Sequence, residues 1–266
     1  MRENELLKTA INAAVKAGVE IMKVYQLDFS VEYKADNSPL TMADKAAHLA
    51  ITEILSITGI PVLSEEGKKM PYAERKGWKR FWLVDPLDGT KEFVKRNGDF
   101  TVNIALMDEN KPVMGIIYVP VSGMLYFASK GAGAYRITLS DNDPFDPALL
   151  KKRGTALPMP QPKRNYTVVA SRSHLSDETI HFIDELKKET PEIDFVSVGS
   201  SLKLCMIAEG KADLYPRFGP TMEWDTAAGH ALVGISGGYV KRADNGEQLD
   251  YNKENLLNPW FIAGRY

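Results

Sequence analysis

The chain has 266 residues, which is enough to bury a large hydrophobic core in one or two domains. Its net charge of −2 provides no global basic field, so overall charge does not favour nucleic acid or an anionic membrane as a partner, although a local basic pocket stays open. The single cysteine, Cys205, excludes an intrachain disulfide and suits a reducing compartment, and no apolar run approaches the ~20 residues that span a bilayer.

The beginning of the chain predicts two helices. Apolar residues between positions 4 and 25 recur at helical spacing and predict an amphipathic helix, whose interrupting charges distinguish it from a signal peptide. Residues 29–40 contain a short candidate strand and a polar loop. A second helix is expected over residues 41–59, with Thr41 as its N-cap and Asp44 in its first turn.

The next part of the chain predicts strands. Its apolar runs have the length of strands and are separated by turn residues, and the last three favour an antiparallel meander. The predicted strands cover residues 60–67, 80–86, 101–107, 112–121 and 123–130.

A change of composition marks a candidate domain boundary. Residues 141–165 are dominated by proline and charge and show no periodicity. After them, strand and helix patterns alternate to the end of the chain, which is typical of an α/β arrangement. The sequence therefore predicts an N-terminal α+β domain over residues 1–150 and a C-terminal α/β domain over residues 151–266.

An apolar strand ends in two acids within the stretch FWLVDPLDGTKEF. Asp85 stands at the carboxyl end of that strand, where α/β-type sites usually lie, and Asp88 returns to the same side. Leu87 offers a backbone carbonyl, Gly89 permits close backbone approach, and Thr90 adds a hydroxyl at the start of a short helix. Two carboxylates and a carbonyl beside an anion site suit Mg²⁺ that bridges to a phosphate, and a plain turn with capping aspartates is the structural alternative.

A related pattern of acids occurs in the haloacid-dehalogenase phosphatases, which use an aspartyl nucleophile. In this chain Asp85 and Asp88 are three residues apart rather than two, and a proline stands between them. That spacing does not place the second acid where a general acid must act on an aspartyl ester. The sequence therefore does not favour that class.

Further acids stand in comparable positions. Glu65 and Glu66 end a second apolar strand. Asp225 precedes a helix of small residues, and Asp44 lies in a predicted first turn. Each acid has a purely structural explanation, as part of a solvated turn, as an N-cap or as a partner of the helix dipole. Together, however, they complete a known pattern.

The pattern is carried by SEE at Ser64–Glu66, DPLDGTKEF at Asp85–Phe93 and WDTAAGHAL at Trp224–Leu232. With these motifs, and with matches nearly from end to end, the chain resembles the inositol monophosphatase superfamily of Mg²⁺-dependent, lithium-sensitive phosphatases. Within it, the chain is similar to the bacterial CysQ-type 3'(2'),5'-bisphosphate nucleotidases. The resemblance implies a layered αβαβα sandwich of the sugar-phosphatase type, which combines α+β and α/β features. Residues 141–165 match no motif, and Glu223, where members are often non-acidic, is assigned no function.

The resemblance also implies a metal centre with two or more Mg²⁺ ions. One ion is expected to bind Glu65, Asp85 and the Leu87 carbonyl. A second ion is expected to bind Asp85, Asp88 and Asp225. In such a site one ion turns water into a nucleophile while the other stabilises the leaving oxygen, and no phosphoenzyme is implied.

Catalytic roles follow from the same resemblance. Asp44 and Thr90 are expected to orient and deprotonate the attacking water, and Glu66 is placed with them as a catalytic residue. The backbone N–H groups of Gly89 and Thr90 are expected to hold phosphate oxygens.

Substrate choice is expected to come from the second half of the chain. Ser200 stands at a helix start with Lys203 one turn in, while Arg217 lies in a Pro-Gly loop. His174 follows a strand, where a lone histidine is more often structural. Two cations and an aromatic ring nevertheless suit a second phosphate and a purine. The residues that the resemblance places at the substrate are Glu65, Leu87, Asp88, Gly89, Thr90, His174, Ser200, Lys203, Arg217 and Asp225.

The implied function is hydrolysis of the 3'-phosphate of adenosine 3',5'-bisphosphate to give AMP and phosphate, which clears a by-product of sulfate assimilation. A small-molecule nucleotide is thus the expected partner, and the cytoplasm, including the periphery of the inner membrane, is the expected location. Two alternatives stay open. One is an inositol- or sugar-phosphate phosphatase on the same scaffold, and the other is a nucleotide sensor without catalysis.

Overall fold

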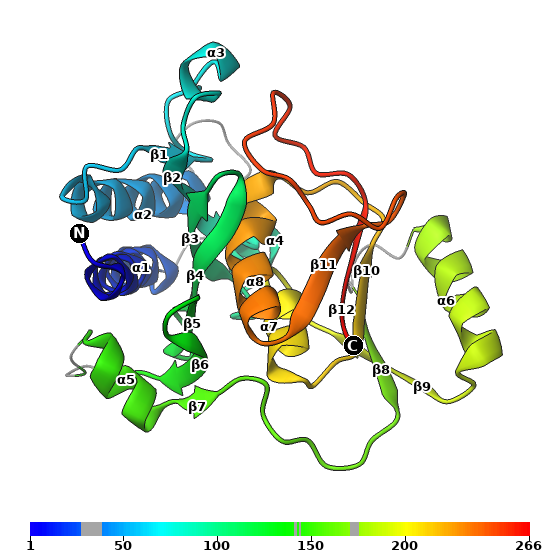
Figure 1. Ribbon diagram of the computed structural model, residues 1–266. Helices are drawn as coiled ribbons and strands as arrows, with labels where there is room; N and C mark the ends of the chain where they lie inside the picture. The colour runs from blue at the N-terminus through cyan, green and yellow to red at the C-terminus, as the bar shows by residue number, and fades with distance from the viewer. Residues whose placement is uncertain (28–38, 141–142, 144, 171–175) are drawn as a thin grey trace.

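The computed structural model describes residues 1–27, 39–140, 143, 145–170 and 176–266, and Figure 1 shows its elements arranged in five layers. A pair of helices covers one face of a seven-stranded sheet, a second pair lies between this sheet and a five-stranded sheet, and one helix covers the far side. The predicted αβαβα sandwich is therefore confirmed. In layer order, the helices are α1 (Glu3–Tyr25) and α2 (Pro39–Ser56), α7 (Leu202–Glu209) and α8 (Glu223–Ile235), and α6 (Asp177–Glu189).

The two outer helices follow the prediction with one correction. α1 buries its apolar face against α2 and the seven-stranded sheet. α2 begins at Pro39, because a proline suits the first turn of a helix, where its missing N–H is not needed. Thr41 therefore lies inside the helix rather than at its N-cap, and Asp44 lies beyond the first turn. The strand predicted within residues 29–40 falls, up to residue 38, outside the described residues.

The seven-stranded sheet carries the motif strand β2 in its interior. Its order is β1-β2-β3-β4-β5-β6-β7, with β1 parallel to β2 and all later neighbours antiparallel, so the predicted meander is confirmed. Asp85 pairs with Asn103 and Asp88 with Thr101, and the register between β2 and β3 shifts between the two acids. The strands are β1 (Val62–Ser64), β2 (Arg80–Asp88), β3 (Thr101–Asp108), β4 (Lys111–Val119), β5 (Met124–Ser129), β6 (Gly133–Thr138) and β7 (Thr155–Ala156).

The small residues of α8 allow it to pack closely between two layers. A Cβ atom on Gly115 of β4 would lie 2.2 Å from the Ala228 carbonyl oxygen, and one on Gly229 would lie 2.3 Å from a methyl carbon of Leu204 in α7. Only glycine permits such approach. α8 is thereby fixed against β4 and against α7, which sets the position of its first turn.

The region predicted as a domain boundary contains regular structure. Asp146 caps the helix α5 (Pro147–Arg153), accepting the Ala148 N–H at 2.8 Å, and β7 then pairs with β6 of the first sheet. Residue 150 thus falls inside α5, and the sequence did not predict α5, β6 or β7. The division of the chain into two domains stays a prediction.

The five-stranded sheet has the order β11-β12-β10-β8-β9. β8 is parallel to β9 and β10, whereas β12 is antiparallel to β10 and β11. The predicted alternation of strands and helices is confirmed here, although β11 was not predicted. The strands are β8 (Tyr166–Ala170), β9 (Ile193–Ser197), β10 (Leu214–Arg217), β11 (Gly238–Arg242) and β12 (Phe261–Arg265), and the short helices elsewhere are α3 (Tyr72–Arg75) and α4 (Thr90–Val94).

None of the helices in the described part of the chain has the length and apolar character needed to cross a membrane.

Candidate active site

The two acids of the motif lie at the end of β2, where the strand becomes irregular. Asp85 is 2% exposed, and its Oδ1 accepts a hydrogen bond from the Leu87 N–H at 3.0 Å. Pro86 has no N–H to give to the sheet and stands where the register with β3 shifts. The irregular strand end thus brings a second acid, Asp88, to the same region three residues after the first.

Gly89 turns the chain from β2 into α4. Its φ of 94° lies in the left-handed region, and a Cβ atom there would lie 3.2 Å from both the Asp99 carbonyl oxygen and the Phe100 Cα. Thr90 follows as the exposed first residue of α4, which confirms the predicted short helix. The N–H groups at the start of α4 therefore follow Asp88 directly in the chain.

Acids from separate segments gather around Asp85. Glu65 follows β1, Asp225 lies in the first turn of α8, and Asp44 lies in α2. Charges that act on one another in this way lie within about one screening length, ~10 Å, because solvent and salt weaken the interaction of more distant pairs. Burial raises the pKa of Asp85 well above its ordinary value, and in decreasing order the charges of Asp88, Glu65, Asp225 and Asp44 raise it further.

Burial and neighbouring negative charges also raise the pKa values of the other acids. Burial, followed by the charges of Glu66 and Glu65, raises the pKa of Asp44 to about 8. Burial, followed by the charge of Asp88, raises the pKa of Asp225 to about 7. The Glu65 residue as a whole is exposed, but neighbouring protein atoms partly desolvate its carboxylate, and this desolvation raises the pKa of Glu65 as well. A cation offsets both desolvation and mutual repulsion, so this cluster favours bound metal.

The carboxylates are not arranged as a coordination shell. In the described parts of the chain, no three His, Cys, Asp or Glu side chains converge in a way that could hold an ion. The acids instead accept hydrogen bonds from the chain: Asp225 Oδ2 accepts the Met222 N–H at 2.9 Å, as Asp85 accepts that of Leu87. Oxygen ligands of this chemistry are those that Mg²⁺ prefers. The donor set therefore fits the ion, but the carboxylates must turn toward it.

Asp88 joins the two halves of the chain. Its Oδ2 accepts hydrogen bonds from the Ser200 hydroxyl at 2.6 Å and the Ser201 N–H at 2.7 Å, and Asn103 Nδ2 donates to it at 3.3 Å. Ser201 Oγ donates to Asn103 Oδ1 at 2.8 Å, and Thr101 Oγ1 lies 2.6 Å from Ser200 Oγ. Sequence reasoning missed Thr101 and Asn103, for which the available signal was polar residues in an otherwise apolar strand.

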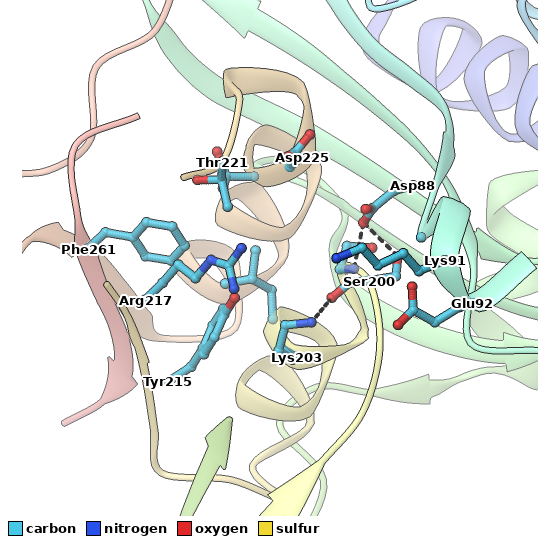
Figure 2. Close-up of a pocket in the computed structure, with 14 residues that line it drawn as sticks. Asp88, Lys91, Glu92, Ser200, Lys203, Tyr215, Arg217, Thr221, Asp225 and Phe261 are labelled. Carbon is cyan, nitrogen blue, oxygen red and sulfur yellow. Dashed lines mark hydrogen bonds between the residues drawn. The ribbon is translucent and has the colours of Figure 1, made fainter. Parts of the chain in front are cut away.

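A cavity of about 150 Å³ opens beside this turn, and Figure 2 shows the side chains that line it. Asp88 and Asp225 lie on one side, while the Arg217 side chain enters from β10. Lys203 and Ser200 line it from α7 and the turn before it. The cavity thus combines proposed metal ligands with the two cations expected at the substrate.

A second cavity of about 440 Å³ continues from the first. The two share Lys91, Tyr215 and Arg217 in their linings, and the second extends to Ala170 and Phe218. Sequence reasoning missed Lys91, although it directly follows the Gly-Thr pair of the motif. Together the two cavities offer room for a phosphate group with a larger substituent attached.

Lys203 is a buried cation. It is 8% exposed, and its Nζ donates to the Ser200 carbonyl oxygen at 2.7 Å and to that of Val198 at 3.3 Å. Burial lowers the pKa of Lys203 to about 8. The negative charge of Asp88 acts to raise this pKa, whereas the positive charge of Arg217 lowers it further. An anion in the cavity would favour the charged lysine and raise this pKa again.

The structure brings most of the predicted site residues together. Leu87 lies between the two motif acids with its side chain buried, and Thr90 adjoins Gly89. His174 lies outside the described residues. The acid cluster and the first cavity contain Asp44, Glu65, Glu66, Asp85, Asp88, Gly89, Ser200, Lys203, Arg217 and Asp225.

Comparison with known proteins places these features in a family. A profile described as the inositol monophosphatase family matches residues 2–260. The 3'(2'),5'-bisphosphate nucleotidase CysQ of Salmonella typhimurium is 45% identical over 98% of this chain and 100% of its own length. The crystal structure of CysQ from Bacteroides thetaiotaomicron is 52% identical, with a TM-score of 0.94 over 99% of this chain and 98% of that chain. Inositol monophosphatase-II from Staphylococcus aureus shares the fold at 22% identity, with a TM-score of 0.72 over 97% of this chain and 89% of that chain.

Proposed function

The chain belongs to the inositol monophosphatase family, and from that membership we propose that it is a 3'(2'),5'-bisphosphate nucleotidase. Its substrate is adenosine 3',5'-bisphosphate, whose 3'-phosphate it hydrolyses to give AMP and phosphate. The identity of 45% to a nucleotidase of this name, over that protein's full length, supports the proposal. The reaction removes a by-product of sulfate assimilation, and the lone buried Cys205 suits the reducing cytoplasm as its location.

One observation carries the choice of substrate: carboxylates and cations line the same small cavity. Asp88 and Asp225 supply the anionic side, and Lys203 and Arg217 supply the cationic side. A monophosphate of a neutral polyol has no second anion to match two cations, one of which is buried. A bisphosphate has one phosphate for each side.

The second cavity supports a nucleoside rather than a small polyol. Its lining includes Tyr215 and Phe218, and it adjoins Arg217, which can form two parallel hydrogen bonds to a phosphate. A nucleoside placed there would extend from the 150 Å³ cavity into the 440 Å³ cavity. An inositol ring is small enough to leave most of that space empty.

We propose two Mg²⁺ ions as the cofactors of this metal-dependent family member. Glu65, Asp85 and the Leu87 carbonyl would hold one ion, and Asp85, Asp88 and Asp225 the other. The support is the crowding of buried acids that raise one another's pKa values, which a cation relieves. When bound, such ions supply Lewis-acid activation of water and neutralise charge on the phosphate.

The protein's own groups then position water and move its proton. The Thr90 hydroxyl orients the water, and the Asp44 carboxylate accepts its proton. Burial and then the charge of Glu66 raise the pKa of Asp44 in the metal-free chain, and bound cations would lower that pKa and leave the carboxylate ionised to accept the proton. The N–H groups of Gly89 and Thr90 at the start of α4 hold the phosphate oxygens where negative charge accumulates.

A phosphate-release assay tests the proposal. Adenosine 3',5'-bisphosphate, 3'-AMP and inositol 1-phosphate would be compared at saturating Mg²⁺. The proposal expects the highest kcat/KM for the bisphosphate. Preference for inositol phosphate would assign the chain to the polyol phosphatases, which the comparisons do not favour. Tight binding of the bisphosphate without phosphate release would indicate a sensor.

A further inference from the structure

The first turn of α8 contains a buried acid for which the proposed reaction has no role. Glu223 is 0% exposed and stands two residues before Asp225. A buried carboxylate is strongly destabilising unless opposite charge and hydrogen bonds compensate its lost hydration. Its partners therefore show what the residue holds in place.

Glu223 holds a segment of chain that is distant in sequence. Its Oε2 accepts the Asn252 N–H at 2.6 Å, and its Oε1 accepts the Lys253 N–H at 3.0 Å and the Lys253 Nζ at 2.5 Å. Asn252 has a φ of 63°, which is uncommon for a residue other than glycine. The carboxylate thus fixes a backbone conformation that is unfavourable by itself.

The same segment is fastened to the start of α8 by other bonds. The Glu223 N–H donates to the Leu256 carbonyl oxygen at 2.9 Å, and Asn258 Nδ2 donates to that of Met222 at 2.8 Å. Residues 252–258 therefore surround the first turn of α8. Movement of this segment would move the turn that carries Asp225.

Arg75 extends the connection to a third segment. It is 2% exposed, and its guanidinium donates to Asn252 Oδ1 at 2.7 Å and to the Glu254 carbonyl oxygen at 3.0 Å. Asn252 Nδ2 donates back to the Arg75 carbonyl oxygen at 2.9 Å. Arg75 ends α3, in the segment that follows Glu65. The network therefore joins the first turn of α8, which carries Asp225, to the end of α3.

We propose that Glu223 is a positioning residue for Asp225. Its carboxylate fixes the first turn of α8 to Asn252 and Lys253, and through Asn252 to Arg75, and so sets the position of the turn that carries the Asp225 carboxylate. A buried apolar residue would stabilise the fold at least as well as a buried ion pair, but it cannot accept these N–H groups. The inference rests on the proposed role of Asp225 as a metal ligand.

Glu209 offers a matched control. It is 1% exposed on α7, and like Glu223 it pairs with a lysine, here the Lys211 Nζ at 2.7 Å. Its other partners are Arg136 at 2.6 Å and the Tyr126 hydroxyl at 2.9 Å, both on the first sheet. Removing Glu209 therefore perturbs a comparable buried network that holds no proposed metal ligand.

The test compares Glu223→Ala, Glu209→Ala and Asp225→Asn for Mn²⁺ binding, titrated by electron paramagnetic resonance, and for thermal unfolding in EDTA. Both alanine variants should unfold at lower temperature. Only Glu223→Ala and Asp225→Asn should bind Mn²⁺ more weakly, by about tenfold or more, as is usual for residues that orient a metal ligand. Glu223→Gln, which keeps one acceptor oxygen, should recover part of the affinity.

Equal Mn²⁺ affinity in Glu223→Ala and Glu209→Ala would overturn the positioning role. If Glu223→Ala does not fold, Lys253→Met takes its place, because it removes the ion pair and leaves the backbone hydrogen bonds to Glu223. This variant should also bind Mn²⁺ more weakly, with a smaller loss of affinity. Unchanged Mn²⁺ affinity in Lys253→Met would overturn the positioning role as well. Should Asp225→Asn bind Mn²⁺ like the unchanged protein, the metal assignment itself fails. The two failures are distinct, because in the first case Asp225→Asn still loses affinity.

Discussion

Lys203 provides a direct test of the proposed second-phosphate site. Lys203→Met removes the charge and keeps most of the apolar stem. Because Lys203 is only 8% exposed, a phosphate that contacts it is shielded from water, and such a charge-assisted hydrogen bond contributes about 2–3 kcal/mol. At about 1.4 kcal/mol per factor of ten, kcat/KM for adenosine 3',5'-bisphosphate should fall by about 30- to 150-fold.

A second substrate separates this effect from structural damage. Lys203 also donates to the Ser200 and Val198 carbonyl oxygens, so its loss disturbs the adjacent turn for every substrate. 3'-AMP lacks the second phosphate and reports that disturbance alone. The ratio of kcat/KM for the two substrates should therefore collapse in Lys203→Met and Arg217→Ala but stay constant in Asp44→Asn, which impairs proton transfer on both. Equal losses on both substrates would refute the second-phosphate pocket.

The pH dependence of binding gives an independent check on the same residue. Burial lowers the pKa of Lys203 to about 8, so the free protein loses this positive charge as pH rises through 8. KM for the bisphosphate should consequently rise between pH 7 and pH 9. Lys203→Arg keeps its charge over this range, so its KM should lack that rise. An identical rise in Lys203→Met would show that another group titrates.

Other residues give shorter tests. Asp85→Asn should abolish Mg²⁺-dependent phosphate release. It should not lower the unfolding temperature in EDTA, because the substitution relieves repulsion among buried acids. Near-normal turnover at saturating Mg²⁺ would contradict the two-metal proposal. LiCl should inhibit relative to matched NaCl, and equal rates would count against a family-type metal site. Thr90→Ala should lower kcat more than it raises KM, whereas a pure KM effect would move Thr90 to substrate binding. Burial lowers the pKa of His230 to about 4, below its ordinary 6.5. Between pH 7 and pH 5 this histidine therefore takes up a proton in the unfolded chain but not in the folded one, which should lower the free energy of unfolding by about 2 kcal/mol. Urea denaturation of His230→Gln should not show this loss of stability.

Elements with a clear local pattern were predictable from the sequence. The apolar period of α1 and the uninterrupted apolar run of β2 each match the observed element within a few residues. α5 was missed even though Asp146 and Pro147 carry the usual N-cap and first-turn signals, because the surrounding prolines and charges obscured its short apolar face. β6 and β11 begin at glycines and are only partly buried, so neither presents an apolar run.

Most acids of the site were also visible, because Glu65, Asp85 and Asp88 close recognisable strands and Asp225 opens a helix, whereas Asp44 lies beyond the first turn of α2. What the sequence did not show is the geometry between segments. The hydrogen bond between Asp88 and Ser200 joins residues 112 positions apart, and the anchor between Glu223 and Asn252 joins residues 29 apart. Such contacts depend on how α8 and α7 pack onto the first sheet. No local pattern reports that packing.

The conformation of Ser200 shows why a serine stands at this position. Its φ of 53° is a left-handed conformation that costs a non-glycine residue about 1–2 kcal/mol, and glycine would relieve that strain. Glycine would also remove the hydroxyl that donates to Asp88 at 2.6 Å, and a hydrogen bond to a charged acceptor contributes about 1.5–3 kcal/mol. At the central values of these ranges, about 2 kcal/mol against about 1.5 kcal/mol, the hydrogen bond offsets the strain, which accounts for a serine here. Its hydroxyl therefore has Asp88 as its partner in the protein itself, and a substrate that contacts Ser200 must share that hydroxyl with the acid or displace it.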